Sequence, residues 1–329
     1  MVGSIQHLAE AIKLDLIEAL PHQRKTQRNK LALLIATMLH ARSANTMDLA
    51  AQLPLATERI DMRYQWCSRF LANDHVHIQE VMKPFIGSIL EQISKQKLVF
   101  IMDQTHVSKT LEVLMVSLRL AQRAVPLVWV VRKTQGNIGF EDQKDLLESL
   151  SSYLPKNAEV VLLGDRFFAT ANLIAYLKQK GWDYRLRVKK NILIGYRTIE
   201  TRAENLEKMG LTFLEDAVLT GVHEQTNIAV VREEGYENAW IIAMAKKPDA
   251  YKAFDYEMRW GIESMFSDFK TRGFGLEDSQ MRYPQRLGRL ILIMAIAMIW
   301  AVLSGMWHLD HYPLPYEKRL NKPKKLIAA

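Results

Sequence analysis

The chain has 329 residues, which is enough for two or three domains with a sizeable core. Lys and Arg number 44 against 36 Asp and Glu, and the net charge of +8 suits a polyanionic partner, either nucleic acid or an acidic membrane surface. The single cysteine, Cys67, excludes an internal disulfide and any zinc site built from several cysteines.

The first part of the chain, residues 1–96, predicts an all-helical domain. Apolar residues recur at spacings of three and four in Ile5–Leu20, Leu31–Leu39 and Ile78–Ile93. Charged and apolar residues alternate through the N-terminal stretch, so no signal peptide is expected.

A helix-turn-helix pattern lies inside this helical part. Thr46 is expected to cap a short helix, Pro54 to end it, and Thr57 to cap a second helix that carries Arg59 and Arg63. The second helix either contacts DNA through its arginines or belongs to an ordinary helical hairpin with a basic outer face. We favour contact with DNA.

From Lys97 the pattern changes to apolar β-type runs that alternate with helical spacing. The runs LVFIMD, LEVLMVSLRL and AVPLVWVVR predict three strands, followed by a helix, the strand AEVVLLGD and another helix. This order is typical of a ribonuclease-H-like α/β fold. Asp103 and Asp165 fall at or near the C-terminal ends of predicted strands, where a sheet presents side chains to a ligand.

The run DYRLRVKKN predicts a fifth strand with a high density of cations. Arg185, Arg187, Lys189 and Lys190 lie within six positions. They form either a track for DNA phosphates, which we favour, or an exposed edge strand protected by lysine.

The distance from Asp165 to Glu263 is 98 positions, more than a strand and a helix need. The surplus contains FLEDAVLTGV, NIAVVREE and NAWIIAMA, which are rich in β-branched residues. We therefore expect a β-rich insertion at about residues 192–248.

The stretch YEMRWGIESMFSDFK, Tyr256–Lys270, predicts one amphipathic helix. Tyr256, Arg259, Glu263 and Lys270 would share a polar stripe, opposite an apolar sector. The apolar sector would contain Met258, Ile262, Met265 and Phe269. The polar stripe is either a solvated face or a site for a phosphate backbone with a metal ion.

The spacing Y-x2-R-x3-E-x6-K, with MDQT around Asp103 and GDRFF around Asp165, resembles bacterial DDE transposases of the insertion-sequence-four group. The resemblance spans about residues 97–290, with Phe167 at a position where relatives often carry glycine. It implies a catalytic, metal-binding triad of Asp103, Asp165 and Glu263. Two Mg²⁺ ions, with Mn²⁺ as a substitute, would be held with Asp103 as the bridging ligand.

The same resemblance implies that Tyr256, Arg259 and Lys270 hold DNA at the transposon end. Trp240 matches by position a tryptophan that stacks on a flipped base, although a tryptophan in a strand core is an equally open interpretation. The implied function is cut-and-paste transposition, with cleavage at terminal inverted repeats and strand transfer into target DNA. A homodimer in a synaptic complex, in the bacterial cytoplasm at the nucleoid, is expected. An inactive relic that only binds specific DNA sequences is the alternative.

The uncharged stretch Leu290–Trp307 is about as long as the shortest membrane span. It is diluted by small residues, and we favour a buried core helix and no membrane association. The sequence as a whole predicts five parts. They are a helical DNA-binding domain (1–96), the first part of the core (97–191), the β-rich insertion (192–248), the second part of the core (249–310) and a basic tail (311–329).

Overall fold

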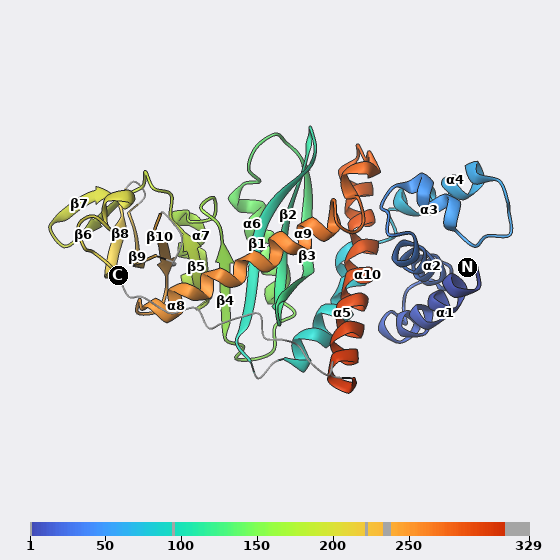
Figure 1. Cartoon of the computed structure of the whole chain (residues 1–329), viewed down its shortest axis with the longest axis horizontal. Coiled ribbons are helices and arrows are strands. Elements are labelled where there is room, and N and C mark those ends of the chain that lie inside the picture. The colour runs from blue at the N-terminus through green and yellow to red at the C-terminus, as the bar shows by residue number, and fades with distance from the viewer. Residues whose placement is uncertain (1, 94–95, 221–222, 233–237, 313–329) are drawn as a thin grey trace.

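The computed structural model describes residues 2–93, 96–220, 223–232 and 238–312. Helices precede the first strand in this part of the chain, as the sequence predicts (Figure 1). They are α1 (Val2–Ala19), α2 (Lys25–Ala41), α3 (Thr46–Gln52), α4 (Ile60–Leu71) and α5 (Ile78–Gln92).

The caps of α3 and α4 differ from the prediction. The side chain of Asn45 accepts a hydrogen bond from the N–H of Met47, so Asn45 is the N-cap of α3 and Thr46 is its first residue. Thr57 accepts from the N–H of Arg59 in a turn before α4 and does not cap that helix directly. Asn and Thr are both good caps, and spacing alone does not choose between neighbours.

The strands of the described residues form one sheet of ten strands in the order β3-β2-β1-β4-β5-β10-β9-β8-β6-β7. They are β1 (Leu98–Ser108), β2 (Leu111–Leu120), β3 (Arg123–Lys133), β4 (Val160–Gly164), β5 (Asp183–Arg187), β6 (Leu193–Tyr196), β7 (Ile199–Arg202), β8 (Phe213–Leu219), β9 (Glu224–Val231) and β10 (Trp240–Met244).

The first half of the sheet combines antiparallel and parallel pairing. β1, β2 and β3 are antiparallel neighbours, whereas β4 is parallel to both β1 and β5. The crossovers are the helices α6 (Phe140–Ser151) and α7 (Ala171–Gln179). β1 and β4 are buried along their parallel register, as expected for strands covered on both faces.

The strands of residues 192–248 continue this sheet. β10 pairs with β5 in antiparallel fashion, and β9, β8, β6 and β7 follow outward. The insertion is rich in strand as predicted, but β6 and β7 were not expected, because their short segments have weak alternation.

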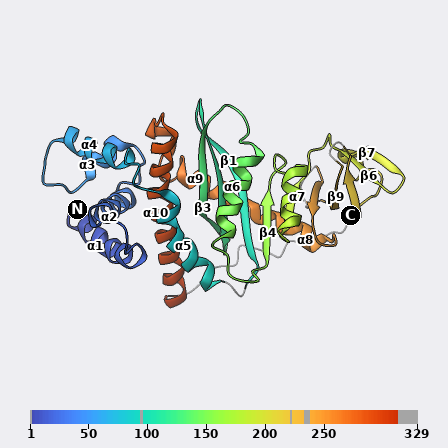
Figure 2. The same cartoon turned by 180° about the vertical axis from the view of Figure 1, so that it is seen from behind.

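Helices cover the two faces of the central strands. α6 and α7 lie on one face, and a helical segment crosses the other (Figures 1 and 2). That segment consists of α8 (Ala250–Phe254), the 3₁₀ helix η2 (Asp255–Arg259) and α9 (Trp260–Phe269). The prediction of one α-helix over Tyr256–Lys270 is therefore wrong, since its first turn is 3₁₀ and Lys270 follows its last residue. Ile262, Met265 and Phe269 are buried, as predicted.

The long helix α10 (Pro284–His311) stands between β3 and the N-terminal helices (Figure 1). The short 3₁₀ helices η1 (Ala203–Asn205) and η3 (Leu276–Ser279) complete the elements of the described residues. α10 is the one helix in the described residues long and apolar enough to cross a membrane, yet 56% of its apolar window is buried inside the protein. Its burial agrees with the predicted core helix. The basic tail predicted after α10 lies outside the described residues, apart from its first two positions.

Candidate active site

Asp103 and Asp165 lie on neighbouring parallel strands of the sheet. The parallel register pairs Met102 of β1 with Gly164, the last residue of β4. Asp103 and Asp165 are the residues that directly follow this pair. Asp165 follows the end of β4, as predicted. Asp103 lies in the middle of β1 and not at its end, because β1 continues to pair with β2 as far as Ser108.

Glu263 reaches the same region from α9, linked through Arg259. One guanidinium nitrogen of Arg259 lies 2.5 Å from a carboxylate oxygen of Glu263, and the other lies 3.4 Å from Asp103. A single arginine therefore connects a strand carboxylate with a helix carboxylate. Gly261 on α9 allows the side chain of Arg119 on β2 to pack against this helix, because a Cβ there would collide with its guanidinium.

The pKa of Asp103 is raised from 3.8 to about 6. Burial is the largest cause, followed by the nearby charge of Asp165, with a smaller contribution from Glu263. The N–H of Gln104 and the guanidinium of Arg259 oppose this shift. The net effect is a region of concentrated negative charge in which a cation would be stabilised.

The chemistry of these donors suits a hard divalent cation. Carboxylate oxygens are ligands that Mg²⁺ prefers, usually together with waters and substrate oxygens. Within the described ranges, no three Asp, Glu, His or Cys side chains are grouped closely enough to hold one ion. Arg259 instead bridges Asp103 and Glu263, so metal ligation by both residues would require this guanidinium to exchange partners.

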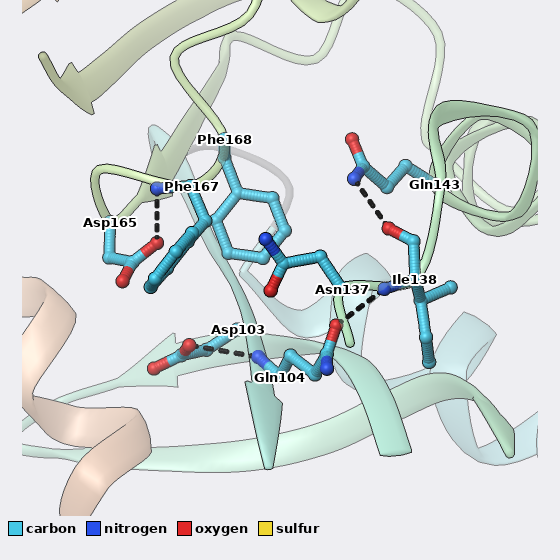
Figure 3. A pocket seen from close by; sticks show the side chains of 8 residues that line it. All are labelled: Asp103, Gln104, Asn137, Ile138, Gln143, Asp165, Phe167 and Phe168. Carbon is cyan, nitrogen blue, oxygen red and sulfur yellow. Dashed lines mark hydrogen bonds between the residues drawn. The ribbon is translucent and has the colours of Figure 1, made fainter. Parts of the chain in front are cut away.

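A pocket of about 130 Å³ opens beside the two aspartates (Figure 3). Its lining residues come from β1, the loop after β3, α6 and the turn after β4: Asp103, Gln104, Asn137, Ile138, Gln143, Asp165, Phe167 and Phe168. The N–H of Phe167 donates to Asp165 at 2.8 Å, and the N–H of Gln104 donates to Asp103 at 2.8 Å. Both carboxylates are thus oriented by local backbone.

Gln104 fixes the loop on the far side of this pocket. Its side chain accepts from the N–H of Ile138 at 2.8 Å and donates to the carbonyl of Gly136 at 3.1 Å. It also donates to Glu112, a buried carboxylate that contacts His106. Sequence reasoning missed this role of Gln104, although its position next to Asp103 was a signal that could have indicated it.

Tyr256 and Trp240 are buried in an aromatic cluster. Trp240 is 4% exposed and lies edge-to-face with Tyr256, Phe254 and Trp260. Tyr256 is 2% exposed, and burial raises the pKa of its phenol. Tyr256 belongs to the predicted polar stripe, but its ring is buried against Trp240. The burial of Trp240 favours the core interpretation over an open base-binding face.

The cations of β5 and the following loop divide into two groups. Arg185 is 1% exposed, pairs with Asp183 at 2.9 Å and donates to the carbonyl of Lys252. It therefore has no exposed face for a phosphate, contrary to the prediction. Arg187 is half-buried, whereas Lys189 and Lys190 are exposed.

The remaining predicted DNA contacts lie apart from the carboxylates. Arg59 is exposed and pairs with Asp61, whereas Arg63 donates to the carbonyls of Ala51, Leu55 and Thr57. The guanidinium of Arg63 thus holds the turn between α3 and α4.

Lys270 lies just beyond α9, and its ammonium pairs with Glu277 at 3.0 Å. Its side chain is partly exposed.

Comparison with known proteins gives one assignment. No curated protein matches the chain. The family model described as the transposase DDE domain matches residues 127–300, slightly more than half of the chain. Asp165 and Glu263 lie within the matched residues, and Asp103 lies before them. The chain belongs to the transposase DDE domain family.

Proposed function

We propose that this protein is a DNA transposase of the insertion-sequence-four group that works by cut-and-paste transposition. It would cleave DNA at the terminal inverted repeats of an element and transfer the strands to target DNA. The observation that carries the proposal is that Asp165, after β4, and Glu263, on α9, both lie near enough to Asp103 on β1 for their charges to raise its pKa. Their charges interact, and Arg259 contacts two of them.

The arrangement of the central strands supports a ribonuclease-H-like core for this reaction. Three antiparallel strands, β3, β2 and β1, are followed in the sheet by β4 and β5 parallel to β1. The middle of this sheet carries both aspartates. The connections through α6 and α7 leave the opposite face free for α9 and Glu263 (Figures 1 and 2).

Asp103, Asp165 and Glu263 would hold two divalent ions, Mg²⁺ or Mn²⁺. Such ions activate the attacking hydroxyl and stabilise the leaving oxygen during displacement at phosphorus. Backbone N–H groups of Gln104 and Phe167 orient the aspartate carboxylates before any ligand arrives.

Arg259 would couple DNA binding to the exposure of the carboxylates. Its guanidinium is paired with Asp103 and Glu263. A DNA phosphate is also an anion that can accept two hydrogen bonds from a guanidinium, so it is an alternative partner to these carboxylates. When the guanidinium turns to a phosphate, both carboxylates become available as ligands. Lys270 would exchange Glu277 for a phosphate in the same way.

We propose that double-stranded DNA also contacts residues outside the carboxylate site. The exposed Lys189 and Lys190, with Arg187 beside them, would contact its backbone, and Arg59 would contact it from the helical domain. We propose a homodimer in a synaptic complex with two element ends, in the bacterial cytoplasm.

The test is cleavage of DNA that carries the inverted repeats flanking the coding region. Asp103→Asn, Asp165→Asn and Glu263→Gln should each abolish Mg²⁺-dependent cleavage, because a neutral amide cannot replace a metal-binding carboxylate. Circular dichroism and binding of the same DNA in EDTA should stay close to wild type.

Two outcomes would contradict the proposal in different ways. Wild-type cleavage by any one variant would remove that residue from the catalytic set. Specific binding by the wild-type protein without any cleavage in Mg²⁺ or Mn²⁺ would favour the inactive, DNA-binding alternative.

A further inference from the structure

Glu112 on β2 is a buried carboxylate that does not line the pocket of Asp103 and Asp165. It is 7% exposed and lies opposite His106 in the register of β1 and β2. Successive side chains of a strand point to opposite faces of the sheet, so Gln104 and His106 share one face of β1 and Asp103 belongs to the other. A buried carboxylate costs free energy unless its oxygens accept hydrogen bonds, so the partners of Glu112 indicate its purpose.

The two carboxylate oxygens of Glu112 have different partners, both on β1. Oε2 accepts from the side-chain amide of Gln104 at 3.0 Å, and Oε1 lies 2.6 Å from Nδ1 of His106. Arg132, which lies opposite Glu112 on β3, pairs with Asp142 of α6. Glu112 therefore binds the two side chains that follow Asp103 on the same face of β1.

The contact with Glu112 determines which way the amide of Gln104 faces. An ionised carboxylate only accepts hydrogen bonds, so the amide nitrogen faces Glu112 and the amide oxygen is left for the loop after β3. There the oxygen accepts from the N–H of Ile138 at 2.8 Å, and the nitrogen also donates to the carbonyl of Gly136 at 3.1 Å. If the amide were reversed, two donors would face each other and the hydrogen bond to Ile138 would be lost.

Asp103 lies at the point where β1 loses one of its neighbouring strands. β4 pairs with β1 only as far as Met102, whereas β2 continues along β1 to Ser108. In the described part of the chain, β1 is therefore paired with a strand on one side only from Asp103 onward. Gln104 follows directly, and its own N–H donates to the carboxylate of Asp103 at 2.8 Å. The side-chain contacts of Gln104 thus add support to β1 where β4 has ended.

We propose that Glu112 is a positioning residue for the candidate active site and that it acts through Gln104. It fixes the amide of Gln104, which holds the loop of Ile138 and the part of β1 that carries Asp103. The consequence for DNA cleavage rests on the proposed function, whereas the hold on the loop does not. Such positioning matters because a displacement of about 1 Å in a catalytic group can lower a rate about 100-fold.

Hydrogen–deuterium exchange of the full-length protein, without metal or DNA, measures the hold on the loop. Mass spectrometry follows exchange in the peptide that spans residues 134–140. Glu112→Ala should speed exchange at Ile138 about 2- to 13-fold, the range expected for the net loss of one hydrogen bond. Gln104→Ala should have the same effect. The double variant should exchange no faster than Gln104→Ala alone, because Glu112 acts through Gln104.

Two further variants separate this role from a general effect on the fold. The amide of Glu112→Gln can still accept from Gln104 and donate to His106, because Nδ1 of a neutral imidazole is able to accept, so exchange at Ile138 should stay as in wild type. Asp183→Asn is the matched control, because Asp183 on β5 is another buried carboxylate that accepts hydrogen bonds and is 5% exposed. It should lower the melting temperature without changing exchange at residues 134–140.

Cleavage of inverted-repeat DNA in Mg²⁺ tests the consequence for catalysis. Glu112→Ala should lower kcat by about 10- to 100-fold. Its affinity for the same DNA in EDTA and its circular dichroism should stay close to wild type. Glu112→Gln should cleave with nearly the wild-type kcat, since it keeps the acceptor for Gln104.

Wild-type exchange at residues 134–140 in Glu112→Ala would overturn the inference, as would faster exchange throughout the protein. A double variant clearly faster than Gln104→Ala, or a wild-type kcat for Glu112→Ala despite a loosened loop, would overturn it too. If the wild-type protein cleaves no DNA, the proposed function fails, and the exchange data still decide whether Glu112 holds the loop.

Discussion

The η2–α9 segment carries two groups of side chains with opposite purposes, one charged and one aromatic. Arg259 and Glu263 face the charged residues around Asp103, whereas Tyr256 and Trp260 pack against Trp240 in an apolar cluster. The charged group holds carboxylates close together at an electrostatic cost, and the aromatic group buries large rings. Stability and reactivity are thus separated within a few residues of one helical segment.

Tyr256 and Arg259 are the point of contact between the aromatic and the charged group. The guanidinium carbon of Arg259 lies 5.5 Å from the centroid of the Tyr256 ring. The 3₁₀ turn brings side chains at this spacing over one another, so the aromatic cluster supports the arginine that contacts the carboxylates. Loss of the aromatic cluster is therefore expected to affect both groups, whereas changes at the carboxylates should spare the fold.

Removal of the central ring of the cluster should have the largest effect on stability. Trp240→Ala is expected to lower the free energy of unfolding by about 3 to 5 kcal/mol through the cavity it leaves. Thermal and urea denaturation measure the effect, with Trp240→Phe as a milder variant and the exposed Trp307→Ala as control. Normal melting of Trp240→Ala, with a defect only in steps that need a flipped base, would instead support a base-stacking role.

Neutralisation of Asp103 should stabilise the fold at neutral pH. Because the folded-state pKa is about 6 against 3.8 unfolded, the folded protein binds more protons between these values, and stability falls as pH rises through them. Asp103→Asn should therefore raise the free energy of unfolding by on the order of 2 to 3 kcal/mol at pH 7.5. The gain should vanish near pH 4.

Urea denaturation at both pH values measures this difference. Asp142→Asn is a suitable control, because Asp142 pairs with Arg132 at the surface and has no part in the site. A lower stability for Asp103→Asn at pH 7.5 would mean that the contact with Arg259 outweighs burial and repulsion.

The smallest expected effect is on DNA affinity at Lys270. Lys270→Ala should leave stability nearly unchanged and reduce the slope of log affinity against log salt by about one. Titrations at several salt concentrations measure the slope, with the exposed Lys208→Ala as control. An unchanged slope would mean that Lys270 does not contact a DNA phosphate and only pairs with Glu277.

Patterns within single strands and helices predicted most of the fold. The apolar runs ending near Asp103 and Asp165 predicted β1 and β4, and parallel pairing of these strands then brings the two carboxylates together. The spacing of Ile262, Met265 and Phe269 predicted the buried face of α9. These patterns are local in the sequence. They predict the structure correctly because burial of apolar side chains determines which face of a strand or helix points into the core.

The contacts that sequence reasoning missed depend on residues far apart in the chain. Arg185 is buried because Lys252 offers a carbonyl and Asp183 a carboxylate in the folded protein, and no local pattern distinguishes it from an exposed arginine. Tyr256 is buried because Trp240 lies on β10 beneath it. The loop of Asn137 is held near Asp103 by the side chain of Gln104, which binds Gly136 and Ile138.

We propose that Asp103, Asp165 and Glu263 together bind divalent metal for DNA cleavage. The most direct measurement is a Mn²⁺ titration followed by electron paramagnetic resonance, with inverted-repeat DNA present, of wild type and the three amide variants. We expect two tightly bound ions per chain in the wild type, at least one fewer in Asp165→Asn and Glu263→Gln, and the largest loss in Asp103→Asn. Unchanged Mn²⁺ binding in all three variants would contradict the claim.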